Sequence, residues 1–389
     1  MVPDGWFIEV VANLFDVQLG KMLNQKAKEL QPHYTYLTNF NVRWGCFDLS
    51  KLNTMHFSEK EIQKFTLKKG DLIMCEGGEV GRCAIWIGEI SNCYYQKALH
   101  RLRVKGEINA EYFQTYMRYI AGTKRLEDYT GRTSIAHLTR EKLLKIPVLT
   151  PPLVEQNKIA KILTTWDKAI ATTEKLLANS QHQKKSLMQQ LLTGKKRFPE
   201  FDGEWEKLYL KDIATIIMGA SPSSGAYNES GEGLPLLQGN ADIKDRVSMP
   251  RVYTSQVTRE CEVNDILIGV RAPVGSVARS MHHACIGRGI AAIRAKEYFI
   301  QKYIYFWLLY FEPRWERLSQ GSTFESVNSN DVKTLHLNIP LIDEQRKIAV
   351  VLSTSDSEIE TLKKKLDCLK KQKKALMQQL LTGKRRVSV

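Results

Sequence analysis

A nine-residue run occurs twice in this chain, because Leu187–Lys195 and Leu376–Lys384 both read LMQQLLTGK, 189 positions apart. The same shift carries Glu155–Ala160 (EQNKIA) onto Glu344–Ala349 (EQRKIA). Repeats in solenoids and propellers recur about every 20–50 residues, so this period excludes such architectures. The sequence instead predicts two copies of one half-molecule and a protein with internal pseudo-twofold symmetry.

Each half joins a mixed segment to a long helical one. The mixed segments contain short apolar, β-branched and aromatic runs such as Gly70–Met74 and Cys83–Ile87, which are typical of buried strands. From about Leu153 to Leu192 the composition changes to Lys, Gln, Leu and Ala with no internal Gly or Pro, and Gly194 supplies a C-terminal stop. One long helix is predicted there, and the second copy follows the same pattern between Pro340 and Gly383.

The predicted fold class is α+β, with two similar globular α/β domains separated by two long helices packed as an antiparallel coiled coil. The predicted segments are 1–151 (first globular domain), 152–197 (first helix and connector), 198–340 (second globular domain) and 341–389 (second helix and basic tail). Helices of this length would measure about 60 Å. We therefore expect them to act as a spacer between the globular domains.

Both helices contain a heptad-like seam, in which positions recur at alternating steps of three and four. The C-terminal seam is Ile359, Leu362, Leu366, Leu369, Lys373, Leu376 and Leu380. The matching seam in the first helix is Ile170, Thr173, Leu177, Ser180, Lys184, Leu187 and Leu191. Its polar members predict an interface that is only partly dry.

The two globular domains share a weaker likeness. Gly70–Ile73 corresponds to Asn264–Leu267, and Val80–Gly81 to Val274–Gly275, both shifted by 194 positions. Gly131–Thr133 likewise resembles the turn Gly321–Thr323. We interpret the shared positions as scaffold, and we expect the unshared ones to distinguish the two domains.

The charge balance favours a polyanionic partner. Lys and Arg number 57 against 42 Asp and Glu, which gives a formal net charge of +15 and a pI near 9.3. No run of 18 or more apolar residues and no signal-type N-terminus occurs, so the expected compartment is the cytoplasm. Nucleic acid is the leading candidate partner.

Cysteine usage indicates neither a disulfide framework nor a zinc site. The chain has seven cysteines, an odd number, and no C-x-x-C pair. The run His282–Cys285 lacks a second ligand pair at a suitable distance. We expect reduced thiols and no bound metal.

These features together resemble one known family. Two divergent α/β domains, each followed by a long helix that opens with E-Q-x-K-I-A and closes with L-M-Q-Q-L-L-T-G-K, look like the specificity subunit of a type I restriction-modification enzyme. The domain openings, Asp4-Gly5-Trp6 and Asp202-Gly203-Glu204-Trp205, fit the same pattern. The resemblance covers essentially the whole chain.

The resemblance implies different functions for the globular domains, the long helices and the partner subunits. Each globular domain would be a target recognition domain that reads one half of a bipartite sequence in double-stranded DNA, and the paired helices would set the gap between the halves. The helices would dock two methylation subunits, and restriction subunits would join to cleave unmodified DNA. S-adenosylmethionine, ATP and Mg²⁺ would serve these partner subunits, with no cofactor in this chain.

The residues independently favour a non-catalytic role. The chain contains no G-x-x-x-x-G-K-[ST] phosphate loop and no N-P-P-Y-like or D-P-P-Y-like methyltransferase motif, nor a convincing nuclease site. Gly77–Gly81 is glycine-rich but lies in a hairpin context, so a nucleotide-binding interpretation is weak. Catalysis is expected in the partner subunits.

Base reading requires Arg or Lys for guanine and Asn or Gln for adenine, carried on loops that enter the grooves. Two loops carry that chemistry, Thr38–Trp44 in the first domain and Leu236–Asn240 in the second. The predicted DNA-binding residues are Thr38, Asn39, Asn41, Arg43, Lys97, Arg101, Arg132, Gln238, Asn240, Arg246, Arg271 and Arg288. Ordinary hydrogen bonding at strand ends is the alternative for both loops.

Other functions remain open at this stage. A free-standing bipartite DNA-binding or architectural protein would use the same domains without partner subunits. The missing motifs disfavour a fused nuclease or methyltransferase, and a purely structural coiled-coil scaffold would leave the divergence of the two globular domains unexplained.

Overall fold

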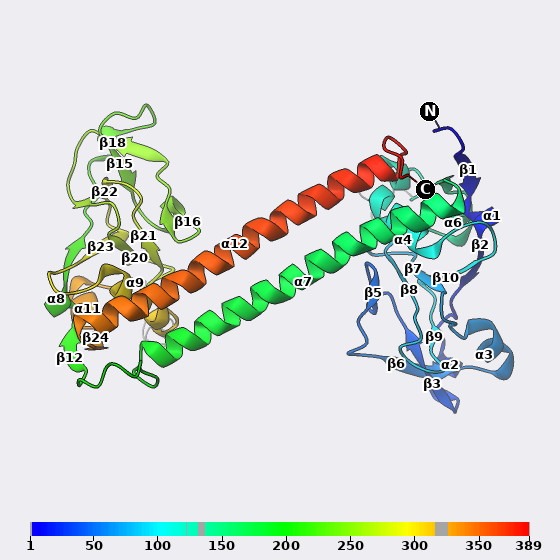
Figure 1. The fold of residues 1–389 in the computed structure, drawn as a ribbon, viewed down its shortest axis with the longest axis horizontal. Coiled ribbons are helices and arrows are strands. Elements are labelled where there is room, and N and C mark those ends of the chain that lie inside the picture. Colours follow the sequence, from blue (N-terminus) through cyan, green and yellow to red (C-terminus); the bar gives the residue numbers. More distant parts are fainter. Residues whose placement is uncertain (1, 122, 131–136, 316–325, 389) are drawn as a thin grey trace. The chain divides into compact units, whose positions relative to one another are not determined.

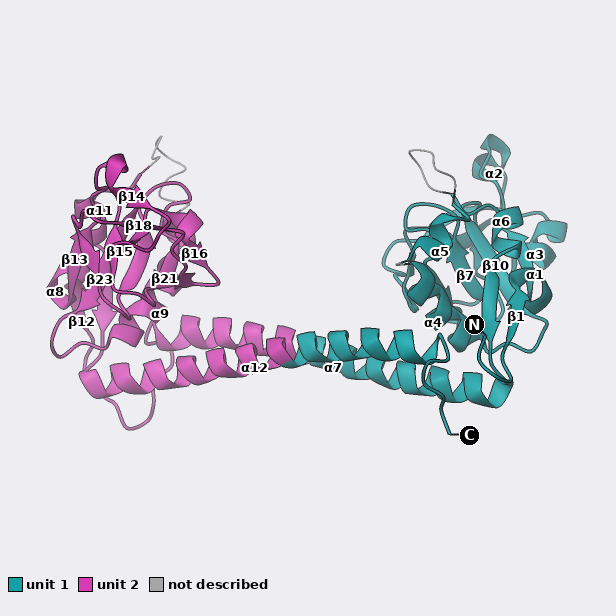
Figure 2. Cartoon of the chain, turned by 90° about the horizontal axis from the view of Figure 1, so that it is seen from above, with its two compact units in different colours: residues 1–174, 365–389 teal, residues 175–364 magenta. Residues whose placement is uncertain are grey.

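The computed structural model describes residues 2–121, 123–130, 137–315 and 326–388. The chain divides into two compact units: unit 1 contains residues 1–174 and 365–389, and unit 2 contains residues 175–364 (Figure 2). Each unit therefore combines one globular domain with part of both long helices, although those parts are far apart in the sequence. The predicted α+β class with two similar globular domains and two long helices is confirmed.

Unit 1 is built from the elements labelled in Figure 1. In chain order they are β1 (Phe7–Val10), α1 (Val11–Leu14), β2 (Phe15–Leu19), α2 (Gln25–Glu29), β3 (His33–Leu37), β4 (Val42–Arg43), β5 (Cys46–Phe47), β6 (Asn53–His56), α3 (Glu59–Phe65), β7 (Leu72–Cys75), β8 (Cys83–Ile85), β9 (Tyr94–Tyr95), β10 (Leu99–Val104), α4 (Ala110–Ala121), α5 (Lys124–Glu127), α6 (Arg140–Leu144) and β11 (Pro147–Thr150).

The first long helix, α7 (Leu153–Leu191), begins in unit 1 and ends in unit 2. Unit 2 continues with β12 (Glu206–Tyr209), α8 (Leu210–Ile213), β13 (Ala214–Met218), η1 (Ser224–Ala226), β14 (Tyr227–Asn228), β15 (Leu234–Leu237), η2 (Asn240–Asp242), β16 (Ile243–Lys244), β17 (Val247–Ser248), β18 (Val252–Thr254), β19 (Glu260–Cys261), β20 (Ile266–Gly269), β21 (Val277–Arg279), β22 (Ala284–Ile286), β23 (Ile290–Ala295), α9 (Gln301–Phe311), α11 (Ser329–Lys333) and β24 (His336–Ile339). The second long helix, α12 (Ile342–Leu380), leads back into unit 1.

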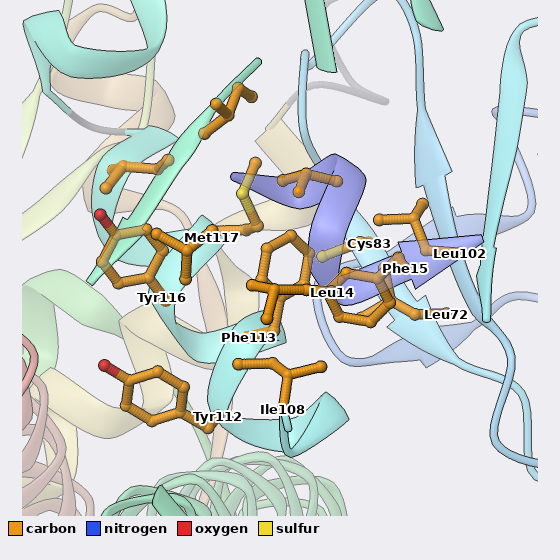
Figure 3. Packing of buried hydrophobic residues seen from close by; sticks show 14 of the residues in the cluster. Leu14, Phe15, Leu72, Cys83, Leu102, Ile108, Tyr112, Phe113, Tyr116 and Met117 are labelled. Carbon is orange, nitrogen blue, oxygen red and sulfur yellow. The ribbon is translucent and has the colours of Figure 1, made fainter. Parts of the chain in front are cut away.

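The main sheet of unit 1 has the strand order β2-β10-β7-β8, and all three pairings are antiparallel. Because successive side chains of a strand point to opposite faces, Leu72 and Ile73 enter different cores. Helix α4 covers the Leu72 face, where the rings of Phe15 and Phe113 lie 4.5 Å apart between centroids (Figure 3). The opposite face packs against the aromatic side chains of β9 and of the loops around it.

Unit 2 repeats this sheet in the order β13-β23-β20-β21 and extends it with β17 and β16. Helix α9 occupies the position of α4, because its buried residues share a core with Ile266 and Ile268 of β20. A two-stranded sheet also recurs, as β1-β11 in unit 1 and β12-β24 in unit 2. The weak sequence likeness between the two domains therefore reflects one shared scaffold.

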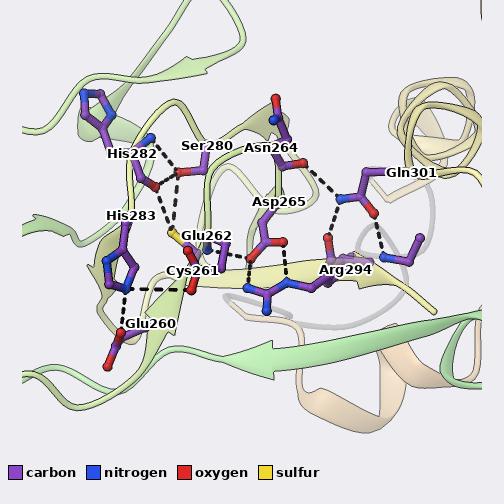
Figure 4. Close-up of polar contacts among 12 residues, drawn as sticks. Glu260, Cys261, Glu262, Asn264, Asp265, Ser280, His282, His283, Arg294 and Gln301 are labelled. Atoms are coloured by element: carbon purple, nitrogen blue, oxygen red, sulfur yellow. Dashed lines mark hydrogen bonds and ion pairs between the residues drawn. The ribbon is translucent and has the colours of Figure 1, made fainter. Parts of the chain in front are cut away.

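A buried aspartate before the third strand of each main sheet is part of that scaffold. Asp71 is bound by Arg103 through two hydrogen bonds of 2.7 Å, and Asp265 is bound by Arg294 at 2.8 and 2.7 Å (Figure 4). In both pairs, hydrogen bonding to the carboxylate is the main cause that raises the pKa of the arginine. These bidentate contacts tie the start of one strand to its neighbour.

Each long helix begins at a buried glutamate that binds an arginine from the tail of the other helix. In unit 1, Arg386 donates two hydrogen bonds of 2.8 Å to Glu155, which also accepts one of 3.0 Å from Trp6 Nε1. Burial acts to raise the pKa of Glu155, but the bonds from Arg386 and Trp6 outweigh it and lower that pKa. The repeated sequence motifs therefore meet in one side-chain cluster.

Unit 2 contains the same cluster, built by Arg197, Glu344 and Trp205. Arg197 binds Glu344 at 3.0 and 2.7 Å, and Trp205 Nε1 donates to the same carboxylate at 3.2 Å. The glycines of the two TGK runs, Gly194 and Gly383, have φ values of +69° and +67°, a conformation that favours glycine at a helix C-terminus. Both helix ends thus turn sharply and return the arginine to the other helix.

The predicted seams are confirmed, since every seam residue of both helices is buried or half-buried. Their lysines are paired with aspartates of the facing helix: Lys373 with Asp167 in unit 1 and Lys184 with Asp356 in unit 2, each at 2.5 Å. In unit 1, Lys370 also pairs with Glu174 at 2.8 Å. Ascending positions on α7 meet descending ones on α12, so within each unit the helices run antiparallel.

Candidate nucleic-acid interface

The first predicted reading loop follows β3 and is held by its own buried side chains. Asn41 Oδ1 accepts hydrogen bonds of 2.9 Å from both the amide and the hydroxyl of Thr38, and Asn41 Nδ2 donates to the carbonyls of Asp48 and Lys51. Thr38 and Asn41 are 7% and 4% exposed. These two predicted residues therefore stabilise the turn, and their hydrogen-bonding groups face inward.

The two residues between them are more accessible to solvent. Asn39 is half-buried beside Gly78, where a Cβ would lie 3.9 Å from Asn39 Nδ2, and Phe40 is exposed. Arg82 supports the main chain of the turn, because it donates a 2.8 Å hydrogen bond to the carbonyl of Asn39. The turn therefore presents Asn39 and Phe40 on a supported backbone.

Arg43 lies on β4, next in sequence, with half of its side chain exposed. Its contact with Asp48 is long, at 3.4 Å. The pKa of Asp48 is lowered chiefly by hydrogen bonds from the side chain and amide of Ser50, with Arg43 contributing less. The guanidinium of Arg43 is thus only weakly engaged and can contact a phosphate or a base edge.

The hairpin between β7 and β8 lies against this turn. Trp44 Nε1 donates to Glu79 at 2.5 Å, and the amide of Gly45 donates to the carbonyl of Cys83 at 3.0 Å. On its other side the hairpin forms a bridge between Gly77 and His137. Residues 76–82 are therefore neighbours of the predicted reading loop, and they include the Val80–Gly81 pair that the sequence indicated as scaffold.

Lys97 joins the same group. Gln96 donates from its amide to the carbonyl of Leu37 at 3.0 Å, and Glu76 donates from its amide to Ala98 at 2.9 Å. The two residues that flank the exposed Lys97 thus bind Leu37, just before the turn, and Glu76 of the hairpin. Three segments distant in sequence, 38–45, 76–82 and 96–98, converge in unit 1.

Unit 2 builds a corresponding arrangement with different side chains. Asp242 takes the place of Asn41: its carboxylate accepts from the amide of Gln238 at 2.8 Å and from Arg251 at 2.9 Å. Asn240 Nδ2 donates to the carbonyl of Pro273 at 2.9 Å, and Asn240 Oδ1 accepts from Ser276. The second turn is therefore also attached to its hairpin, here through the Asn240 side chain.

The remaining predicted residues of unit 2 differ in their freedom. Arg271 is exposed on the hairpin, and Arg288 is exposed on the segment equivalent to that of Lys97, where Gly287 donates to Leu237 at 2.8 Å. Arg246 binds Glu312 and the carbonyl of Val277. Arg288 Nε donates only a long hydrogen bond of 3.4 Å to Ser221. Arg271 and Arg288 are therefore more available to a ligand than Arg246.

Of the two remaining predicted residues, one is paired inside the sheet and the other lies outside the described residues. Arg101 is on β10, 6% exposed, and its guanidinium forms an ion pair with Asp16. That position is inside the sheet, away from the converging loops. Arg132 lies outside the described residues. The prediction of DNA contact stays a prediction for the whole set.

The residues predicted to bind DNA did not include Phe40 or the hairpin residues 76–82 of unit 1. The Gly-Gly pair at positions 77 and 78 was a usable signal, because such pairs mark exposed turns. The equivalence of Lys97 and Arg288 had no sequence signal, because it follows from hydrogen bonds between segments far apart in the chain.

Neither a metal centre nor a membrane span is found in the part of the chain that the structure describes. Among those residues, no three His, Cys, Asp or Glu side chains form a cluster suited to a metal ion. His282 is instead bound to Ser248 at 2.8 Å. His283 is bound separately, to Glu260 at 2.6 Å (Figure 4). No described helix is long and apolar enough to cross a membrane.

The sequence matches the model of the type I restriction modification DNA specificity domain twice, over residues 3–179 and 202–371. It is 30% identical to the putative type I restriction enzyme MjaX specificity subunit of Methanocaldococcus jannaschii, over 99% of this chain and 95% of that protein. The MjaVIII specificity subunit of the same organism is 25% identical over 99% of this chain and 94% of that protein.

Solved structures share the fold. The HsdS subunit from Thermoanaerobacter tengcongensis aligns with a TM-score of 0.55 and 23% identity, covering 99% of this chain and 98% of that one. The type I S subunit from M. genitalium aligns with a TM-score of 0.64 and 15% identity, covering 97% and 96%. By its two matches to the family model and its full-length relatives, the chain belongs to the family of type I restriction-modification DNA specificity subunits.

Proposed function

We propose that each globular domain reads one half of a bipartite target in double-stranded DNA. The observation that carries this proposal is the corresponding arrangement of turn, hairpin and basic segment in both units. Its buried residues have equivalent roles, since Asn41 and Asp242 each accept a hydrogen bond from a main-chain amide of their turn. Its exposed residues differ in type between the two units. Such a frame can present two base-reading surfaces of different specificity, which an asymmetric target requires.

The long helices set the gap between the two half-sites and dock two methylation subunits. Their antiparallel seams and the repeated Arg-Glu-Trp clusters give both helix starts the same local structure, which suits two copies of one partner. The methylation subunits transfer a methyl group from S-adenosylmethionine to adenine. Restriction subunits, which use ATP and Mg²⁺, cleave DNA that lacks the mark, and the complex works in the cytoplasm.

The first test is base-resolution methylation sequencing of DNA from a methylation-free host. The host expresses this chain with its neighbouring methylation subunit, and the control omits this chain. A new split motif with methyladenine on both strands, absent from the control, supports the proposal. A purified complex that adds no methylation would contradict it and favour a free-standing DNA-binding protein.

Exchange of one globular domain tests the division of the target. Residues 204–339 are replaced by the equivalent domain of a relative that has another motif, and the helices are left intact. One half-site should change while the other half-site and the gap are preserved. A change in both half-sites would show that the domains do not read DNA independently.

A further inference from the structure

Phe40 exposes 77% of its surface, more than any other large apolar side chain among the described residues. A phenylalanine left in water forfeits the favourable free energy of burying its ring. Isolated surface hydrophobic residues are common, so exposure by itself assigns no role. The surroundings of Phe40 are what make the exposure informative.

The backbone under Phe40 is unusually well fixed for an exposed turn. The amide of Asn41 donates to the carbonyl of Thr38 at 3.0 Å, which closes the turn with Phe40 at its third position. The buried Asn41 side chain binds residues on both sides of the turn, and Arg82 holds the carbonyl of Asn39. Because this backbone is already fixed, the turn loses little conformational entropy when Phe40 contacts a partner.

The turn of Phe40 and the segments bonded to it carry amide and basic side chains, together with the acidic Asp48 and Glu79, which bind Arg43 and Trp44. Asn39 precedes it, Arg43 follows on β4 with half of its side chain exposed, and the exposed Lys97 belongs to the segment bonded to Leu37. Amide and cationic side chains on the same loop, and on a segment bonded to it, suit a DNA groove, where phosphates surround the base edges. They do not suit an apolar protein partner, whose surface would leave these polar groups unpaired.

Unit 2 places a different residue at the matching position. Its turn is closed by Asp242, which donates from its amide to the carbonyl of Gly239 at 3.0 Å as Asn41 does to Thr38. The residue before Asp242 is Ala241, which is exposed. The same frame therefore presents a large aromatic side chain in one unit and a methyl group in the other.

We propose that Phe40 makes an apolar contact with a base of the DNA half-site read by unit 1 and sets the specificity at that position. The contact is made with the apolar surface of the base, at a thymine methyl group in the groove or at the face exposed by a partly opened base step. This inference rests on the proposed function. It adds a specificity-determining residue to the amide and basic side chains of the interface.

The test compares four forms of the full chain in complex with its methylation subunit: wild type, Phe40→Ala, Ala241→Phe and Ile87→Ala. Ile87 is the matched control, because it is 64% exposed in the same unit. It comes after the C-terminal end of β8, whereas the hairpin next to the Phe40 turn precedes β8. The methylated motif of each form is sequenced. Duplex affinity is then measured for the cognate site and for single-base variants of the unit 1 half-site.

Phe40→Ala should lower discrimination at one or two adjacent base pairs of that half-site by roughly tenfold or more, the usual range for one lost base contact. The other half-site and the melting temperature should not change, and Ala241→Phe should alter only the half-site read by unit 2. Replacing thymine by uracil at the affected position reproduces the loss if the methyl group is the contact. A 2-aminopurine signal that disappears in Phe40→Ala indicates the opened step instead.

The inference is overturned if Phe40→Ala keeps the wild-type motif and single-base discrimination, or if its affinity falls equally for every sequence. A wild-type complex that yields no split motif would contradict the proposed function itself. The two failures are therefore distinguishable. Any loss of specificity in Ile87→Ala would also count against the inference, because it would show that surface apolar residues affect reading regardless of position.

Discussion

Replacement of Asp167 by asparagine tests how the seam of unit 1 holds a buried charge. Lys373 has only 6% of its side chain exposed and contacts Asp167 at 2.5 Å, whereas 43% of the Asp167 side chain is exposed. Asp and Asn have similar helix propensities, so the change removes the negative charge with little effect on the helix. It leaves the Lys373 ammonium buried without an anionic partner.

Breaking a fully buried pair costs about 3–5 kcal/mol, and a charge-assisted hydrogen bond contributes about 1.5–3 kcal/mol. Because water reaches Asp167, we expect Asp167→Asn to cost about 2 kcal/mol. For a unit of this size each kcal/mol shifts the melting temperature by about 2–4 °C, so the transition of unit 1 should fall by about 4–8 °C.

Lys373→Met removes the other partner and should behave differently. Methionine keeps an unbranched apolar chain in the seam, and the abandoned Asp167 remains in solvent with Arg118 at 3.3 Å. We expect a change within about 1 kcal/mol of zero. Calorimetry of both variants, with hydrogen exchange along residues 153–174 to assign the transition, measures the difference.

Two controls sharpen this test. In unit 2, Lys184 is more exposed than Lys373, at 16%, and lies 5.4 Å from the ring centroid of Phe306, so Asp356→Asn should cost less than Asp167→Asn. Equal losses in Asp167→Asn and Lys373→Met would refute the reasoning. That result would mean that the pair acts by attraction alone and that burial of the ammonium carries no penalty.

The pH dependence provides a second readout. Burial lowers the pKa of Lys373 below 10.5 and outweighs the opposing hydrogen bond from Asp167. Between the folded pKa and 10.5 the unfolded chain binds more protons, so this group adds stability as the pH rises. The difference in stability between Lys373→Met and wild type should therefore be constant near neutral pH and should shift in favour of wild type as the pH approaches 10.5.

Three further predictions concern buried polar groups. Burial lowers the pKa of His100 below 6.5, so the unfolded chain binds more protons than the folded chain just under pH 6.5. Unit 1 should therefore lose stability on acidification. His100→Gln should weaken this pH dependence in thermal melts between pH 5 and 7. Asn41→Ala leaves several buried partners unsatisfied and should cost about 3 kcal/mol in unit 1, whereas Asp242→Asn keeps most contacts of its turn and should cost about 1 kcal/mol, as denaturant titration can check. Glu155→Gln and Glu344→Gln should each destabilise their own unit by about 2 kcal/mol in calorimetry, and a loss confined to one of them would contradict the equivalence of the two clusters.

Local rules made the helices readable from the sequence. Helix α7 spans Leu153–Leu191, within a residue of the prediction, because the prolines before it and Gly194 after it act on their own neighbourhood. The seam was predictable for the same reason, since its spacing depends only on the helical period. The seam lysines had no assigned partners, because their aspartates lie 172 and 206 positions away in the chain.

The sequence predicted the loops of the candidate interface only in part. Asn and Arg in the Thr38–Trp44 run indicated base-reading chemistry, but the inward orientation of Asn41 depends on carbonyls that only the folded turn brings within reach. Arg101 looked like its exposed counterparts in composition, although its strand places it inside the sheet beside Asp16. Side-chain type predicts what a residue can bind, whereas burial decides whether it is free to do so.

By itself, the sequence determined the internal repeat, the long helices with their ends, and the α+β family of the chain, because repetition, helical period and terminal residues are local properties. Only the tertiary structure decided that the turn, the hairpin and the segment of Lys97 meet in one place, with Phe40 exposed above them. These contacts join residues between 22 (Glu76 and Ala98) and 59 (Leu37 and Gln96) positions apart, and the pairing of strands in the sheet decides which residues can form these hydrogen bonds.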